Sequence, residues 1–183
     1  GRGGVKPGER VLITGASGGV GTAAVQIANR AGATVFAVAK GPERVRRVEE
    51  LGAHVVYDRG SVDFSREVWR DTNKRGVHVV FDTVGEAVWP QCLRALAPGG
   101  RLVTSGATTG SRGVTEIRRV FWKQLSIIGS TMGTPAEFRE VMRMVFDGSL
   151  RPVIHAVMPL TETRRAHELL EDGEVFGKLV IVP

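Results

Sequence analysis

The stretch RVLITGASGGVG, residues 10–21, decides the fold that we expect for this chain. Its first five residues have a continuous apolar centre, which is typical of a strand buried on both faces. A glycine turn follows, and residues 22–31 carry small apolar side chains along one narrow helical face until Gly32 ends the pattern. A strand, a tight glycine turn and a helix start together predict a phosphate site, because the first N–H groups of a helix lack internal partners.

The glycines of this turn match a dinucleotide-binding pattern. Gly18 lets the backbone approach a pyrophosphate, and Gly21 lets the helix pack close to the strand. Ala16 stands where the usual pattern has its first glycine. The flanking strand and helix, and a second strand at the usual distance, still favour a nucleotide ligand over a glycine-rich turn without one. The expected phosphate-binding residues are Ala16, Ser17, Gly18, Gly19, Val20 and Gly21.

Beyond this unit the chain alternates between apolar runs and helical patterns. Strands are predicted at residues 10–14, 34–39, 54–57, 77–82, 101–105 and 125–130. Helices are predicted at residues 22–31, 42–51, 64–72, 89–96 and 138–146. Parallel strands need helical, right-handed crossovers, which cover both faces of a sheet. We therefore expect an α/β chain with a Rossmann-type doubly wound parallel sheet of about six strands and helices on both faces.

The pattern changes after Ser149. Residues 153–157 resemble a strand, residues 161–170 a helix and residues 178–182 a final strand, and they do not continue the crossover rhythm. We expect residues 1–149 to form the nucleotide-binding domain and residues 150–183 to form a separate C-terminal segment.

The composition sets outer limits on function. The chain has 183 residues, 42% of them hydrophobic and 24% charged, which fits one globular domain with a short appendage. A single cysteine, Cys92, permits no internal disulfide and fits a reducing, cytoplasmic compartment. There is no signal-like apolar segment and no run long enough to span a membrane. The net charge is +6, but scattered arginines and few aromatics argue against nucleic-acid binding.

The end of the second predicted strand bears on which cofactor binds. NAD enzymes usually place an acid there to hold the ribose 2′-hydroxyl, whereas NADP enzymes place an arginine nearby. This chain has Lys40 and Arg44 and no acid at that point. Arg59, after the third strand, adds a guanidinium that can stack on adenine or bind phosphate. The sequence predicts NADP(H) over NAD(H); the alternative is that these three cations are ordinary surface residues.

Several short motifs, in order and at matching spacing, resemble the medium-chain dehydrogenase/reductase superfamily. They are VKPGERVLI at 5–13, FDTVG at 81–85, LAPGGR at 96–101, LSIIGS at 125–130 and GKLV at 177–180. The resemblance is strongest to the quinone-oxidoreductase and zinc-type alcohol-dehydrogenase-like members and covers essentially the whole chain.

The resemblance implies a cofactor site at the carboxyl edge of the sheet, where open α/β sheets bind ligands. It implies that the nicotinamide end is bordered by Thr83, Val84, Ser105, Gly106, Ala107, Gly129 and Ser130. It further implies that Lys178 reaches the pyrophosphate and that the 125–130 edge strands of two copies pair into a homodimer.

Members of this superfamily carry a catalytic domain before the region matched here, with most substrate contacts and any zinc ligands. The resemblance therefore implies a cofactor-binding fragment of an enzyme that transfers hydride between the nicotinamide and an alcohol, carbonyl, enoyl or quinone substrate. We expect the isolated chain to bind cofactor without turnover. We expect no catalytic residue in this chain. We expect no metal site either, because its four histidines have no ligand spacing with one another or with Cys92. Asp82 is expected to hydrogen-bond in a turn or at the ribose, and Cys92 to lie in the core.

Two other functions match parts of this sequence. The turn also satisfies the TGxxxGxG pattern of short-chain dehydrogenases, but these need a Tyr-x-x-x-Lys pair. The only tyrosine, Tyr57, is followed four residues later by Ser61, so that interpretation fails. A stand-alone NADPH-sensing module without catalysis stays open, because a fold does not by itself imply a function.

Overall fold

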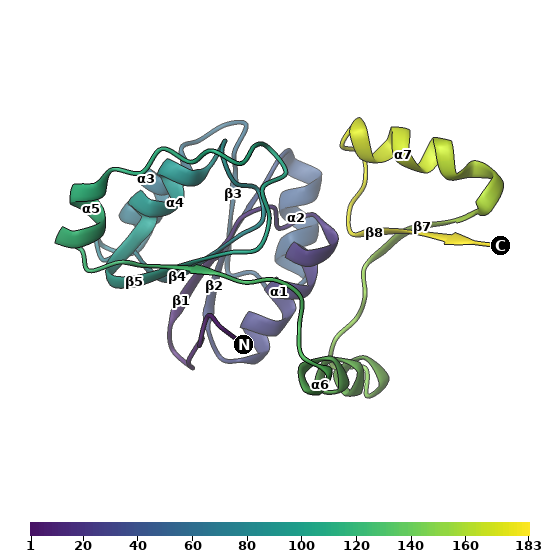
Figure 1. The fold of residues 1–183 in the computed structure, drawn as a ribbon, viewed down its shortest axis with the longest axis horizontal. Helices are drawn as coiled ribbons and strands as arrows, with labels where there is room; N and C mark the ends of the chain where they lie inside the picture. The colour runs from purple at the N-terminus through teal and green to yellow at the C-terminus, as the bar shows by residue number, and fades with distance from the viewer.

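The computed structural model describes all 183 residues and contains a six-stranded sheet in the order β3-β2-β1-β4-β5-β6 (Figure 1). Every neighbouring pair in this sheet is parallel. Its strands are β1 (Arg10–Ile13), β2 (Thr34–Ala39), β3 (Val55–Asp58), β4 (Val77–Asp82), β5 (Leu96–Thr104) and β6 (Ser126–Gly129). The order runs outward in both directions from β1 and β4, so the topological switch lies between these two strands.

Helices cover both faces of the sheet, as the sequence predicted. Helices α1 (Gly19–Arg30) and α2 (Pro42–Glu50) pack on one face, and α3 (Phe64–Asp71) and α4 (Trp89–Ala95) pack on the other. Two further helices, α5 (Ile117–Trp122) and α6 (Pro135–Phe146), contain no buried residue. Leu12 of β1 belongs to the buried cluster that also contains Val68 of α3 and Leu93 of α4. Ile13 belongs to the opposite cluster with Val25 of α1. Successive residues of β1 thus face opposite layers, which requires the continuous apolar run seen in the sequence.

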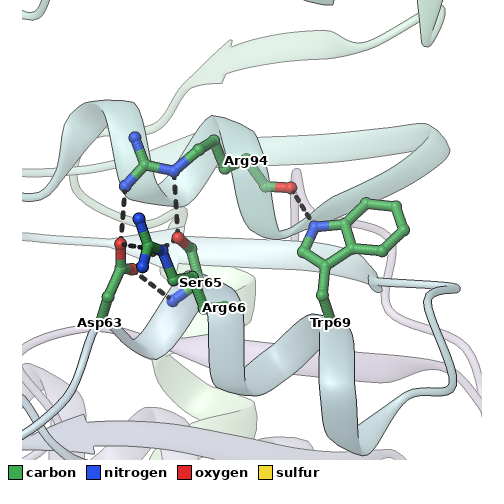
Figure 2. A network of polar contacts seen from close by, with 5 residues as sticks. All are labelled: Asp63, Ser65, Arg66, Trp69 and Arg94. Carbon is green, nitrogen blue, oxygen red and sulfur yellow. Dashed lines mark hydrogen bonds and ion pairs between the residues drawn. The ribbon is translucent and has the colours of Figure 1, made fainter.

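Helices α3 and α4 are held together by the polar network in Figure 2. The Asp63 carboxylate accepts the backbone N–H of Ser65 at 3.0 Å and so caps the start of α3. The same carboxylate forms an ion pair with Arg94 of α4 at 3.2 Å, and the indole N–H of Trp69 donates to the Arg94 carbonyl at 2.7 Å. The network borders a surface hollow of about 660 Å³. Each bond drawn in Figure 2 joins groups of the fold itself, so we assign the network a structural role.

Some element boundaries differ from the sequence predictions. Strand β5 begins at Leu96 rather than residue 101, because Leu96 pairs with Val77 before the Pro98–Gly100 turn interrupts the register. The fourth helix therefore ends at Ala95. Helix α6 begins three residues earlier than predicted.

The early start of α6 has a local cause. The Thr134 hydroxyl accepts the backbone N–H of Glu137, whose carboxylate accepts the N–H of Thr134, which makes a capping box. Helix α5 was not predicted at all. Its six residues are too few for a helical repeat to stand out in the sequence, and none of them is buried.

The C-terminal segment forms a second, smaller unit. Strands β7 (Ile154–Pro159) and β8 (Lys178–Val182) pair in parallel as a separate two-stranded sheet, joined by a short 3-10 turn and helix α7 (Thr163–Glu171). Figure 1 shows this unit beside the main sheet, with the C-terminus directed away from it. Neither strand joins the six-stranded sheet, and the division at residue 149 stays a prediction. No helix of the chain combines the length and apolarity needed to cross a bilayer.

Candidate nucleotide-binding site

The glycine turn lies at the carboxyl end of β1, between the strand and α1. Gly15 has a φ of +58°, a left-handed conformation that favours glycine. The N–H of Ala16 donates to the Val38 carbonyl at 3.1 Å, and the N–H of Gly18 donates to the Gly15 carbonyl at 3.0 Å. The Ala16 side chain is fully buried in the core. Alanine can therefore replace the usual first glycine here, because its methyl group points away from the opening.

The remaining glycines of the turn have different surroundings. A Cβ built on Gly21 would lie 2.6 Å from the Cα of Ala16 and closer still to the Gly15 carbonyl oxygen, so α1 packs directly on the turn. A Cβ on Gly18 would meet nothing nearer than the Gly15 carbonyl oxygen at 3.5 Å. Gly18 is exposed and is the N-cap residue of α1. This open backbone, next to the free N–H groups of a helix start, fits a pyrophosphate.

The C-terminal segment contributes to the same turn. The N–H of Gly177 donates to the Ser17 carbonyl at 2.8 Å. The next residue, Lys178, lies across the first turn of α1: a Cβ on Gly19 would be 2.8 Å from the Lys178 Cγ and 3.0 Å from its Cε. The structure thus places Lys178 against the residues expected to bind phosphate, and an ammonium there adds attraction for an anion. The exposed side chain of Val20 lies in the same first helical turn.

Asp82, the last residue of β4, shapes the neighbouring loop. Its buried carboxylate accepts the Thr14 hydroxyl at 2.5 Å, the N–H of Val84 at 3.1 Å and the N–H of Gly85 at 3.0 Å. These bonds match the turn role expected for it. They hold the loop against the glycine turn, where a Cβ on Gly15 would lie 2.9 Å from the Thr83 hydroxyl.

The ends of β5 and β6 continue this edge. The N–H of Ser105 donates to the Asp82 carbonyl at 3.0 Å, and the N–H of Ser130 donates to the Thr104 carbonyl at 2.9 Å. A Cβ on Gly106 would lie 2.8 Å from the Thr83 carbonyl oxygen. A hollow of about 470 Å³ here is lined by Arg2, Thr104, Ser105, Gly106, Ala107, Gly129, Ser130 and Thr131. All the residues expected at the nicotinamide end therefore lie at or just after the carboxyl ends of β4, β5 and β6, along one edge of the sheet.

The expected 2′-phosphate residues are less closely gathered. Lys40 is exposed at the end of β2, and Arg59 is exposed beyond β3, with its backbone N–H donating to the Ala39 carbonyl at 3.0 Å. The Arg44 guanidinium donates to the carbonyl of Gly173 in the C-terminal segment. Arg44 is thus already engaged by the protein, which sequence reasoning did not anticipate.

Sequence reasoning also missed an acid at this point. Asp58 ends β3 and is the register partner of Ala39, the last residue of β2. Its carboxylate accepts the N–H of Gly41 at 3.0 Å and the N–H of Gly60 at 2.9 Å. These two backbone N–H groups lower the pKa of Asp58 below its ordinary value, the Gly41 bond being the larger cause. The available signal was Asp58 itself, directly after the predicted strand 54–57.

The structure brings together no group of three or more His, Cys, Asp or Glu side chains that could hold a metal ion. Cys92 is fully buried among core side chains, and burial raises the pKa of its thiol well above the usual range. A thiol in that setting is inert, which agrees with the core role expected for it.

Comparisons with known proteins give a consistent picture. A family model for zinc-binding dehydrogenases matches residues 19–147. The chain is similar to an acryloyl-coenzyme A reductase from Sulfurisphaera tokodaii, with 30% identity over 183 residues that cover 99% of this chain and 53% of the relative. It therefore spans about half the length of the curated relatives that it matches.

Solved structures agree. The structure of an NAD-dependent alcohol dehydrogenase matches with a TM-score of 0.94 and 38% identity, covering 100% of this chain and 53% of that one. The crotonyl-CoA carboxylase/reductase AntE in complex with NADP matches with a TM-score of 0.91 and 26% identity, covering 97% and 50%.

Proposed function

The chain belongs to the zinc-binding dehydrogenase family, as a cofactor-binding domain of the medium-chain dehydrogenase/reductase superfamily, and from this premise we propose that it binds NADP(H) for hydride transfer. The substrate of the whole enzyme would be an alcohol, a carbonyl compound, an enoyl compound or a quinone. Its contacts would come from the half of the relatives' length that this chain does not span.

The observation that carries the proposal is the continuous edge formed by the glycine turn and the ends of β4, β5 and β6. The turn is open at Gly18, closed by packing at Gly21 and flanked by Lys178. The open position admits a phosphate to the backbone, while the close-packed one fixes the helix whose N–H groups would bind it.

The residues of this chain would bind and orient the cofactor and would take no chemical part in the hydride transfer. The N–H groups at the start of α1, together with Lys178, hold the pyrophosphate, and Asp82 keeps Thr83 and Val84 in place beside it. The residues after β5 and β6 border the nicotinamide end. The bound nicotinamide supplies or accepts the hydride. Substrate contacts would come from the part of the relatives' length that this chain does not span, so we propose that the isolated chain binds cofactor without turnover.

We propose a preference for NADP(H) because the cations at the end of β2 attract a 2′-phosphate. Lys40 is exposed, and Arg44 has further guanidinium donors beyond the one that contacts Gly173. The NADP complex of AntE is consistent with this choice, although a similar alcohol dehydrogenase is NAD-dependent.

Calorimetric titration of the 183-residue chain with NADPH and NADH tests both parts of the proposal. We expect saturable binding of both, with NADPH tighter. The double variant Lys40→Ala/Arg44→Ala should weaken NADPH roughly tenfold or more, since one charge-assisted contact contributes about 1.5–3 kcal/mol, and should leave NADH nearly unchanged.

The matched control is Arg46→Ala, which removes an exposed cation of α2 that pairs with Glu50 instead. Binding of neither cofactor would refute the function. Equal affinities in the wild type would refute the NADP(H) preference alone.

We also propose a homodimer and a cytoplasmic location. Strand β6 is the last strand of the sheet, and Ile127 on it is 43% exposed. An apolar edge strand is normally covered, and a second copy paired about a two-fold axis would cover it. The one cysteine is a free thiol, which fits a reducing compartment.

A further inference from the structure

A fixed carboxylate occupies the end of β2, although the sequence of β2 contains no acid. Asp58 reaches across from β3, and one of its oxygens accepts both the Gly41 and the Gly60 N–H groups. Its other oxygen has only a longer contact, 3.3 Å, from the Ser61 hydroxyl. Gly41 has a φ of +86°, so the turn that presents its N–H to Asp58 depends on glycine. The carboxylate is held in place and keeps acceptor capacity.

The basic side chains near the Asp58 carboxylate have fewer contacts that hold them in place than the carboxylate itself. Lys40 and Arg59 flank it with exposed side chains, and Arg44 is turned toward Gly173. Glu43, the first acid after β2 in the sequence, forms an ion pair with Arg47 at 3.8 Å and is 74% exposed. Asp58 is therefore the acid that the backbone fixes at the point where β2 ends. Its backbone partners favour the ionised form, so it is charged at neutral pH.

We propose that Asp58 determines how strongly this domain discriminates between cofactors at the ribose 2′ position. A carboxylate accepts a hydrogen bond from a 2′-hydroxyl and repels a 2′-phosphate. Asp58 thus opposes the attraction of Lys40 and Arg44, holds the NADPH preference to a modest ratio and keeps NADH a usable ligand. This inference rests on the proposed function and assigns to β3 a role that the usual pattern gives to β2.

The test compares two probes that differ only by the phosphate in question, 2′,5′-ADP and 5′-AMP, titrated calorimetrically into the full chain. The variant Asp58→Asn removes the charge but keeps an oxygen that can accept the Gly41 N–H. We expect it to bind 2′,5′-ADP roughly fivefold more tightly at low salt, since it removes repulsion across several ångströms of water-exposed space. Affinity for 5′-AMP should stay the same or fall slightly.

The salt dependence of 2′,5′-ADP binding distinguishes a loss of charge repulsion in the Asp58 variants from a change in loop structure. The gain in 2′,5′-ADP affinity should shrink in concentrated salt, because exposed charges are then screened over a few ångströms. The control is Glu162→Gln, the same charge change at the start of α7, which Figure 1 shows at the end of the C-terminal unit remote from α2. It should change neither probe. Asp58→Ser, a second neutral variant, should shift the ratio in the same direction if Asp58→Asn folds poorly.

The outcomes are distinct. Wild-type chain that binds neither probe refutes the proposed function. Binding of both probes with an affinity ratio unchanged in the Asp58 variants overturns the inference and leaves the function standing. A gain that persists in concentrated salt also overturns it, because it would then come from a rearranged loop.

Discussion

Replacing Gly21 with alanine should damage both the stability of the domain and its phosphate site. The new methyl group would lie 2.6 Å from the Cα of Ala16 and 2.8 Å from the carbonyl carbon of Gly15. Both contacts are with backbone, so the turn or the helix must move. Overpacking of this kind costs about 1–3 kcal/mol, and alanine recovers up to about 1 kcal/mol through its better helix propensity.

Because both contacts are with backbone, we take the upper end of that cost, about 3 kcal/mol, and expect a net loss of about 2 kcal/mol in the free energy of unfolding. For a domain of this size that corresponds to a fall in Tm of about 4–8 °C. Calorimetric titration should also show weaker NADPH binding, because the displaced turn is the one that we propose binds the pyrophosphate.

Gly18→Ala is the matched comparison. Gly18 has a φ of −81°, which alanine adopts easily, and its Cβ would have 3.5 Å to its nearest neighbour. Stability should change by no more than about 0.5 kcal/mol. The methyl group would nevertheless enter the space assigned to the pyrophosphate, and NADPH affinity should fall roughly tenfold or more. A Gly21→Ala chain with wild-type Tm and affinity, or a Gly18→Ala chain that binds NADPH normally, would show that the turn is not built as described.

Two further results are expected. Ile127→Pro removes an N–H from the exposed edge strand and should convert a dimer to a monomer in light scattering; an unaltered dimer would place the interface elsewhere. The second concerns Glu9, whose ion pair with Arg101 measures 2.7 Å. Burial alone would raise the pKa of Glu9, but bonds from Arg101 and the Lys6 N–H lower it overall. Because the pKa of Glu9 is lower in the folded state, its carboxylate stabilises the fold at pH values above the ordinary Glu pKa of about 4.3. This stabilisation is lost as the pH falls through the folded-state pKa. Chemical denaturation at pH 7 and pH 3.5 should therefore show a smaller acid-induced loss in Glu9→Gln than in wild type, and equal losses would rule out this source of acid sensitivity.

Local sequence was enough to predict the main sheet because each strand carries its own evidence. Residues 34–39 and 77–82 are apolar runs long enough to be buried on both faces, and the structure confirms both boundaries. The glycine turn could also be predicted from local sequence, since its flanking strand and helix are adjacent to it in the chain.

The features that were not predicted depend on contacts between residues that are far apart in the sequence. Asp58 reaches the end of β2 only because β3 pairs beside it with Ala39 opposite, and no pattern within β2 encodes that register. The contact between Gly177 and Ser17 likewise joins opposite ends of the chain. Helix α5 was missed for a different reason: it has only six residues, too few for a helical repeat to be recognised. Of its apolar residues Val120 packs against the core, while Ile117, Phe121 and Trp122 are exposed.

The bond from the Gly177 N–H to the Ser17 carbonyl has a consequence for the order of assembly. The turn that contains Ser17 is among the first parts of this sequence to be synthesised, whereas Gly177 and Lys178 follow all six strands of the main sheet. During synthesis domains generally fold as units, the N-terminal one first. A sheet that has closed before residue 177 emerges still lacks the Lys178 side chain beside the proposed phosphate site. Ligand stabilises a fold only through the state that binds it, so cofactor reinforces this domain at the last stage of folding rather than guiding the first.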